Sequence, residues 1–225
     1  MRAPRLFGAL LLVAMLAIPS VSAAYFGSLL STDGGIQGTG NWLVTGPTLF
    51  EWVVTQNANN SWHYSYVFGH PDGATSHFIL EVSHNFTSND IFNESGDFTK
   101  MEIGWHPATG LDQPNPNMPE DVYGIKFDEA SGNVTQIEFD SWRVPVWKDF
   151  FAKDGVAGGY GVNTAWNKGF TAGDVDPLDA ARDGSVDYHI LAPDSTTPPV
   201  PEPATLMLLG SGLLGSVAVL RRRRK

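Results

Sequence analysis

The chain has no cysteine among its 225 residues. This absence excludes disulfide bonds, thiol chemistry and zinc sites built on cysteine ligands. A domain without covalent cross-links must be stabilised by the packing of its core, with or without a bound cation.

Basic side chains are scarce in the middle of the chain. Residues 25–200 hold seven Lys or Arg against 23 Asp or Glu, a formal charge of −16. The whole chain carries −10, because the remaining cations lie near its two ends. A surface this acidic repels nucleic acid and anionic lipid, and it favours solubility or the binding of divalent cations. We therefore predict no nucleic-acid partner.

Helical patterns and catalytic motifs are also missing. No window of about twelve residues or more in this region repeats apolar residues at the helical period. The motifs Gly-x-Ser-x-Gly, His-Glu-x-x-His and the phosphate loop do not occur. Carboxylates are abundant, but only their separation in space makes a glycosidase. The sequence therefore favours a non-enzymatic protein, with a polysaccharide hydrolase as the least favoured alternative.

Alternation of apolar and polar side chains runs through most of the region, with Gly, Asn, Asp and Pro between the alternating segments. This pattern is typical of antiparallel strands with one buried face. We predict an all-β domain, an antiparallel β-sandwich or jelly roll of about nine strands. Strands are expected at 41–45, 49–55, 61–68, 75–83, 98–105, 122–127, 135–142, 146–152 and 186–192, with a turn at 69–73 and a long loop over 111–120.

The N-terminus has the layout of a secretory signal peptide. Arg2 and Arg5 precede an apolar stretch over 6–18, and small residues follow up to Ala23 and Ala24. A charged start, an apolar helix and a small-residue cleavage site are the three parts of such a signal. We predict a signal peptide over 1–24, an exported domain over 25–194 and a Pro/Thr-rich stalk over 195–200.

The C-terminus combines a short motif, an apolar stretch and a cluster of cations. Pro201, Glu202 and Pro203 come directly before the apolar residues 204–220, and the cluster consists of Arg221, Arg222, Arg223, Arg224 and Lys225. A helix over 204–220 is about 26 Å long, which is just enough to span a membrane. The cations keep the C-terminus cytoplasmic, so the domain lies outside. A plain anchor leaves the Pro-Glu-Pro motif unexplained, and a GPI signal does not end in five cations.

This tail resembles the PEP-CTERM sorting tail, which is also labelled the C-terminal domain of an ice-binding protein. The likeness rests on Pro201-Glu202-Pro203, the apolar helix and the terminal Arg cluster. The resemblance implies a Gram-negative exported protein associated with exopolysaccharide, transient anchoring in the inner membrane, and an exosortase that removes or exchanges the tail. It covers only the end of the chain, so it assigns a route and not an activity.

Two sets of residues are candidates for ligand binding. Flat aromatic rings stack on sugars, and we expect Trp105, beside His106, and Trp166, in a loop with Asn163 and Asn167, to be the exposed ones. Calcium takes carboxylate oxygens at alternating positions, and the acidic stretch offers Asp174, Asp176, Asp179 and Asp183. It lacks the spacing of an EF-hand, so an irregular Ca²⁺ loop and a solvated connector both remain open.

Together these features predict an exported protein of the cell surface or the extracellular matrix of a biofilm, with a structural or adhesive role. The alternative is a carbohydrate-binding module for the exopolysaccharide of the same cell. No cofactor is predicted apart from the possible Ca²⁺.

Overall fold

The computed structural model describes residues 23–108, 115–130, 132–156 and 161–194. Within these residues the chain forms thirteen strands and one short helix, so the all-β prediction is confirmed. In chain order the elements are β1 (Ala24–Leu30), β2 (Ile36–Thr39), α1 (Asn41–Val44), β3 (Leu49–Gln56), β4 (Trp62–Gly69), β5 (His77–Glu81), β6 (Ile91–Gly96), β7 (Lys100–His106), β8 (Val122–Asp128), β9 (Val134–Ser141), β10 (Val144–Lys148), β11 (Phe150–Val156), β12 (Val162–Asn167) and β13 (Ile190–Asp194).

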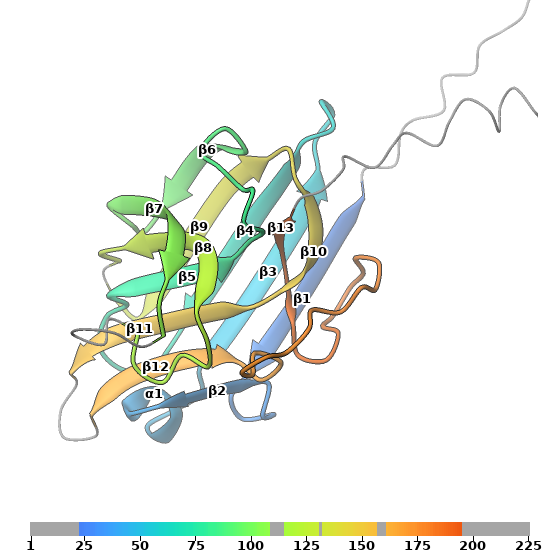
Figure 1. Cartoon of the computed structure of the whole chain (residues 1–225). Helices are drawn as coiled ribbons and strands as arrows, with labels where there is room; N and C mark the ends of the chain where they lie inside the picture. Colours follow the sequence, from blue (N-terminus) through green and yellow to red (C-terminus); the bar gives the residue numbers. More distant parts are fainter. Residues whose placement is uncertain (1–22, 109–114, 131, 157–160, 195–225) are drawn as a thin grey trace, which may run out of the picture.

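The strands form two large antiparallel sheets and one ribbon. The five-stranded sheet has the order β1-β3-β4-β9-β6, and the six-stranded sheet has the order β2-β12-β11-β5-β8-β7. Strands β10 and β13 pair only with each other. In Figure 1 the strands of the five-stranded sheet rise diagonally, whereas β11 and β12 run across them, so the two sheets cross at a steep angle. Such a sandwich needs a corner where a strand passes from one sheet toward the other.

Aromatic rings fill the space between the two large sheets. Strand β4 alternates strictly, with Trp62, Tyr64, Tyr66 and Phe68 buried and the residues between them half-buried. Phe50 of the five-stranded sheet stacks on Phe150 of the six-stranded sheet, with 4.4 Å between ring centroids. Stacked rings at this distance add about 0.5–1.5 kcal/mol to the free energy gained by burial. The core therefore lies between the sheets and joins them.

A second, smaller core covers the outer face of the six-stranded sheet. Ile79 and Phe151 point away from the main core, and Met118 and Phe170 from two loops pack over them. His77 is buried on this side and its Nε2 lies 2.8 Å from the side-chain oxygen of Asn115. Both faces of this sheet are therefore buried near β5 and β11.

Several predicted elements differ from the structure. The residues over 61–68 and 75–83 do not form a hairpin, because β4 pairs with β3 and β9 while β5 pairs with β8 and β11. The connection 70–76 crosses between the sheets instead. Residues 41–45, predicted as a strand, contain α1, in which Trp42 is buried against the Phe68 and His70 rings. Periodicity does not report which sheet a strand joins, which explains the first error, and a run of five residues is too short to separate a helical turn from a strand, which explains the second.

The corner lies between β10 and β11. The residues 146–152 were predicted as one strand, but the pairing of β10 ends at Lys148 and that of β11 begins at Phe150. Asp149 between them is 2% exposed. The predicted strand at 186–192 is shorter than expected, since β13 begins at Ile190. The prediction of about nine strands missed β1, β2, β6 and β12.

We predict that Phe150→Ala lowers the free energy of unfolding by about 3–5 kcal/mol, because it removes a ring at the centre of the stacked core. Urea unfolding followed by tryptophan fluorescence measures the change. The matched control is Phe26→Ala, since Phe26 is 62% exposed and its loss is expected to change the free energy by at most about 0.5 kcal/mol. Equal losses in the two variants would contradict this assignment of the core.

Candidate functional site

The corner at Asp149 is held by side chains that replace missing strand partners. The backbone N–H of Asp149 donates to a carboxylate oxygen of Glu81 at 3.2 Å, and the N–H of Phe150 donates to the side-chain oxygen of Asn167 at 2.8 Å. The amide nitrogen of Asn167 donates to Asp149 Oδ1 at 2.5 Å and to the carbonyl of Tyr188 at 3.0 Å. A bend in a buried strand is thus stabilised by polar side chains inside the protein.

These side chains belong to a larger group of charges, which we call the corner cluster: Glu81, Lys148, Asp149, Asp174, Asp176 and His189. Lys148 Nζ lies 2.5 Å from Asp176, 3.3 Å from Glu81 and 3.6 Å from Asp194. His189 Nε2 lies 3.2 Å from Asp174 and 3.5 Å from Asp149. The four carboxyl groups of the cluster and the neighbouring Asp194 therefore share one lysine and one histidine, so acidic groups outnumber basic groups here.

Burial and the neighbouring charges shift the pKa values of the cluster. Burial raises the pKa of Asp149 to about 9, and the nearby Glu81 charge adds to the shift. Burial also raises the pKa of Glu81 to about 7, although the Lys148 ammonium partly opposes it. Burial alone would lower the pKa of Lys148, but Glu81, Asp176 and Asp194 outweigh it and hold this pKa above its ordinary value. At neutral pH the cluster therefore retains a proton, and Asp149, the most buried carboxyl, holds it.

The geometry brings together two of the four residues predicted to bind calcium. Ligand atoms of Asp149, Asp174 and His189 lie within 4.8 Å of one another, and so do those of Glu81, Asp149 and Asp176. Asp179 instead lies 3.7 Å from Arg182, and Asp183 accepts a hydrogen bond from the backbone of Phe26. Calcium prefers six to eight oxygen ligands, whereas Lys148 and His189 already balance part of the charge here. Calcium binding at Asp174 and Asp176 stays a prediction.

A hollow of about 640 Å³ opens beside this cluster, at the end of β5, β7 and β8. We call it the Trp105 hollow. Trp105 is 58% exposed. The centroid of its ring lies 4.6 Å from the centroid of the His84 ring and 5.8 Å from that of the Tyr123 ring. Trp105 and Tyr123 sit opposite each other in the β7–β8 pairing, which fixes their rings on the same side of the sheet. The rings form an aromatic wall that is open to solvent.

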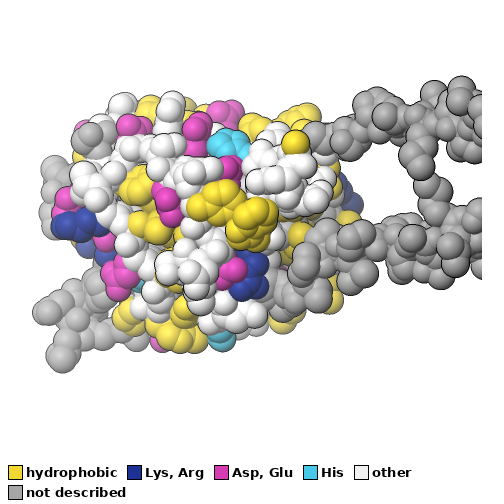
Figure 2. All heavy atoms as spheres, turned by 90° about the horizontal axis from the view of Figure 1, so that it is seen from above, with side chains coloured by type: hydrophobic (Ala, Val, Ile, Leu, Met, Phe, Trp, Pro, Cys, Tyr) yellow, Lys and Arg dark blue, Asp and Glu magenta, His cyan; other side chains and the backbone are white. Residues whose placement is uncertain are grey.

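Three carboxylates complete the Trp105 hollow: Glu81, Glu120 and Asp121. Glu120 accepts a hydrogen bond from the backbone N–H of Gly173 at 2.7 Å, and Asp121 accepts one from that of Ala108 at 2.8 Å. Because Glu81 also belongs to the corner cluster, the hollow and the cluster share one side chain. Acidic groups are not confined to this place, since Figure 2 shows them scattered among hydrophobic side chains on the face seen from above.

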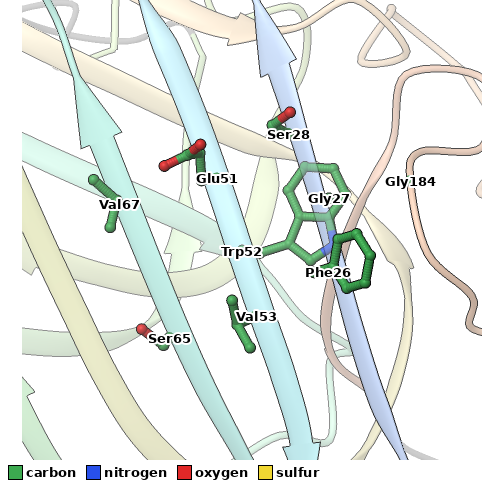
Figure 3. A pocket seen from close by; sticks show the side chains of 9 residues that line it. All are labelled: Phe26, Gly27, Ser28, Glu51, Trp52, Val53, Ser65, Val67 and Gly184. Carbon is green, nitrogen blue, oxygen red and sulfur yellow. The ribbon is translucent and has the colours of Figure 1, made fainter.

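A second hollow of about 430 Å³ lies on the outer face of the five-stranded sheet (Figure 3). Val53, Val67 and Phe26 give it an apolar floor, and Glu51 is its one charged lining residue. The Trp52 ring lies behind β1 at Gly27, where an added Cβ would come within 2.1 Å of the ring. Gly27 is therefore required for packing. With one exposed aromatic ring, this hollow offers fewer recognition groups than the Trp105 hollow.

The structure places the predicted glycan-binding residues in different environments. Trp105 is exposed, as expected. Trp166 lies in strand β12, not in a loop, and packs partly buried against the smaller core. Asn163 and Asn167 have no exposed surface, so the expectation that they face solvent is wrong. Asn163 accepts a hydrogen bond from the backbone of Asn41, and Asn167 holds the corner.

Sequence reasoning missed most members of both sites. Lys148 and Asp149 interrupt an otherwise apolar strand, and two charges at the centre of a buried strand are a usable signal of a special site. Glu81 ends the apolar run of β5 in the same way. The other members, such as His189, Glu120 and Asp121, come from distant loops and become neighbours only in the fold.

The fold and these two sites define a β-sandwich domain with an acidic, aromatic-lined hollow. The chain carries the PEP-CTERM protein-sorting motif, which a family comparison matches at residues 199–224. The motif implies an exported protein with a membrane-anchored precursor that an exosortase processes. Comparison with curated proteins gives no match, and comparison with solved structures gives none.

Among the described residues, no helix is both long and apolar enough to cross a membrane. The predicted signal helix over 6–18, the predicted transmembrane helix over 204–220, the sorting residues and the cation cluster lie outside the described residues. So do residues 111–114 of the predicted loop over 111–120, whose remaining residues 115–120 are described.

The raised pKa of Asp149 predicts how stability depends on pH. An unfolded aspartate has a pKa of about 4, so between pH 4 and pH 9 the folded state holds a proton that the unfolded state releases. The free energy of unfolding therefore falls as pH rises, by up to about 1.4 kcal/mol per pH unit. The measurement is best made between pH 7 and pH 9. Burial lowers the pKa of His70, His77 and His106, so these histidines change the pH dependence of stability only below about pH 6.5.

We expect Asp149→Asn to flatten this dependence, since asparagine keeps an oxygen for Asn167 but binds no proton. Urea unfolding at pH 7, 8 and 9 in the presence of EDTA measures the slope. Asp179→Asn is the matched control and should retain the slope of the unmodified chain, because Asp179 is an exposed member of the same acidic stretch. An unchanged slope in Asp149→Asn would assign the retained proton to another group.

Proposed function

We propose that the domain is a non-catalytic, adhesive module of the cell surface or extracellular matrix, which binds polysaccharide at the Trp105 hollow. Exosortase-dependent sorting delivers it there. The observation that carries the proposal is the exposed Trp105 ring, framed by His84 and Tyr123 and facing three carboxylates. Aromatic faces stack on the apolar faces of sugar rings, and carboxylates accept hydrogen bonds from sugar hydroxyls.

The location of Trp105 supports this use. It lies on β7, the edge strand of the six-stranded sheet, and near the end of that strand. A large apolar side chain at an edge costs solvation free energy unless a partner covers it. The Tyr123 ring beside it is fixed by strand pairing and by a hydrogen bond from the Tyr123 hydroxyl to the carbonyl of Phe86 at 3.1 Å. A preformed wall loses little conformational entropy when a ligand binds.

Hydrolysis of the polysaccharide is the alternative that one observation favours. Glu81 reaches the hollow and has a raised pKa, as a general acid needs. However, one of its oxygens contacts Lys148 and the other accepts from the backbone of Asp149, so both are engaged within the corner cluster. Binding without cleavage is therefore the proposal, and release of new reducing ends from a bound glycan would replace it with hydrolysis.

We expect Trp105→Ala to weaken glycan binding at least tenfold, which corresponds to about 1.4 kcal/mol. A panel of oligosaccharides, screened on an array and followed by calorimetry with the best binder, measures the effect. Trp142→Ala is the matched control, since Trp142 is 50% exposed and packs on Phe92, away from the hollow. Equal affinity in both variants would exclude the Trp105 hollow as the binding site.

The sorting route has its own test. Replacing Pro201, Glu202 and Pro203 by alanine should block processing and leave a full-length, membrane-bound precursor. Mass spectrometry of the cell-associated and released protein identifies the two ends. The control replaces Thr197 and Pro198, which belong to the predicted stalk and lie outside the matched residues 199–224. Normal processing of the motif variant would contradict exosortase recognition through these residues.

A further inference from the structure

The charge of the Trp105 hollow restricts which glycan it can take. Glu81, Glu120 and Asp121 are its acidic lining residues, His84 is its one titratable base, and no lysine or arginine among the described residues lines it. The Lys148 ammonium contacts Glu81 at 3.3 Å and Asp176 at 2.5 Å. A ligand in the hollow therefore meets two carboxylates, Glu120 and Asp121, that form no ion pair with a lysine or arginine of the described residues.

Two of these carboxylates have an oxygen to spare. Glu120 uses one oxygen for the N–H of Gly173, and Asp121 uses one for the N–H of Ala108. Among the described residues, the second oxygen of each has no hydrogen-bond or ion-pair partner. Backbone donors thus fix the orientation of both carboxylates, while an acceptor on each remains available to a ligand.

The aromatic wall, like the carboxylates, favours a positively charged ligand. The face of a tryptophan ring attracts a cation within about 6 Å. In the described part of the chain, Arg143 lies over the ring of Phe86 and Lys168 over that of Tyr188, whereas no lysine or arginine lies over Trp105, whose neighbour is the His84 ring at 4.6 Å between centroids. The exposed face of Trp105 and the spare carboxylate oxygens therefore both favour a positively charged group.

We propose that the Trp105 hollow selects a glycan with free, protonated amino groups, that is, a polymer containing non-acetylated amino sugars. This inference rests on the proposed glycan binding and names its ligand class. The sugar ring stacks on Trp105 while the ammonium group binds Glu120 and Asp121. Acetylation of the amine removes its charge, and a uronic acid in the same place meets carboxylates of like charge.

The test compares three oligosaccharides of equal length: a glucosamine oligomer, its N-acetylated counterpart and a galacturonate oligomer. The exported chain, purified with its tail in a zwitterionic detergent, is titrated by calorimetry at a pH below the pKa of the amine. We expect the glucosamine oligomer to bind at least tenfold more tightly than the acetylated one, and the galacturonate oligomer to bind most weakly. The preference should shrink with added salt, because the partners are exposed charges.

The double variant Glu120→Gln, Asp121→Asn isolates the charge. Both amides keep an oxygen for the backbone donors Gly173 and Ala108, so the hollow retains its shape. We expect its affinity for the glucosamine oligomer to fall to within about twofold of that for the acetylated one, while the acetylated oligomer binds as before. Glu51→Gln is the control, since Glu51 lines the other hollow.

The outcomes separate the inference from the proposed function. Equal binding of the amino and acetylated oligomers, with loss of both in Trp105→Ala, would overturn the amino-sugar preference and leave glycan binding standing. Tighter binding of the galacturonate oligomer would overturn the preference as well. No binding of any of the three, or of neutral glycans on the array, would overturn both.

Discussion

The structure depends on one bend, at which the chain leaves the β10–β13 ribbon and enters the six-stranded sheet. At this point Asp149 has no place in either pairing, yet it lies inside the protein. Glu81 and Asn167 supply the missing hydrogen bonds, and Lys148 and His189 balance the charge. A buried corner made in this way is costly to desolvate, but it allows the chain to pass from the ribbon into the six-stranded sheet. The change of strand partner and the gathering of the carboxylates therefore occur at the same place.

The same bend links stability to recognition. Glu81 accepts a hydrogen bond at the corner and also lines the Trp105 hollow. The charge of its carboxylate therefore affects both places. A positive charge placed in the hollow stabilises the ionised form of Glu81 and so lowers its pKa. The same charge offsets part of the negative charge of the corner cluster. A ligand of this kind would shift the proton of the cluster as it binds. The proposed binding would thus be coupled to folding stability through Glu81.

Local periodicity predicted the class of fold, because strands of the five-stranded sheet such as β4 alternate strictly between buried and half-buried residues. Trp62, Tyr64, Tyr66 and Phe68 show it in β4, and the exposed Trp105 was recognisable beside its polar neighbours. Partner choice was not predictable, since β4 and β5 look like a hairpin in sequence but belong to different sheets. The corner cluster was not predictable either, because His189 and Asp174 are far from Asp149 in sequence. Asn167 shows the limit most clearly: an amide that looked like a surface residue is buried and holds the bend.

The arrangement of the ends connects the domain with its sorting tail. The first and last described strands, β1 and β13, reach the same end of the sandwich (Figure 1). The chain leaves the described domain at Asp194, and Lys148 lies 3.6 Å from that carboxylate while also contacting Glu81. The last described strand is β13, and its partner strand β10 continues directly into the corner at Asp149. The ion pairs of Lys148 with Asp194 and Glu81 therefore connect the C-terminal end of the described domain with a residue that lines the Trp105 hollow.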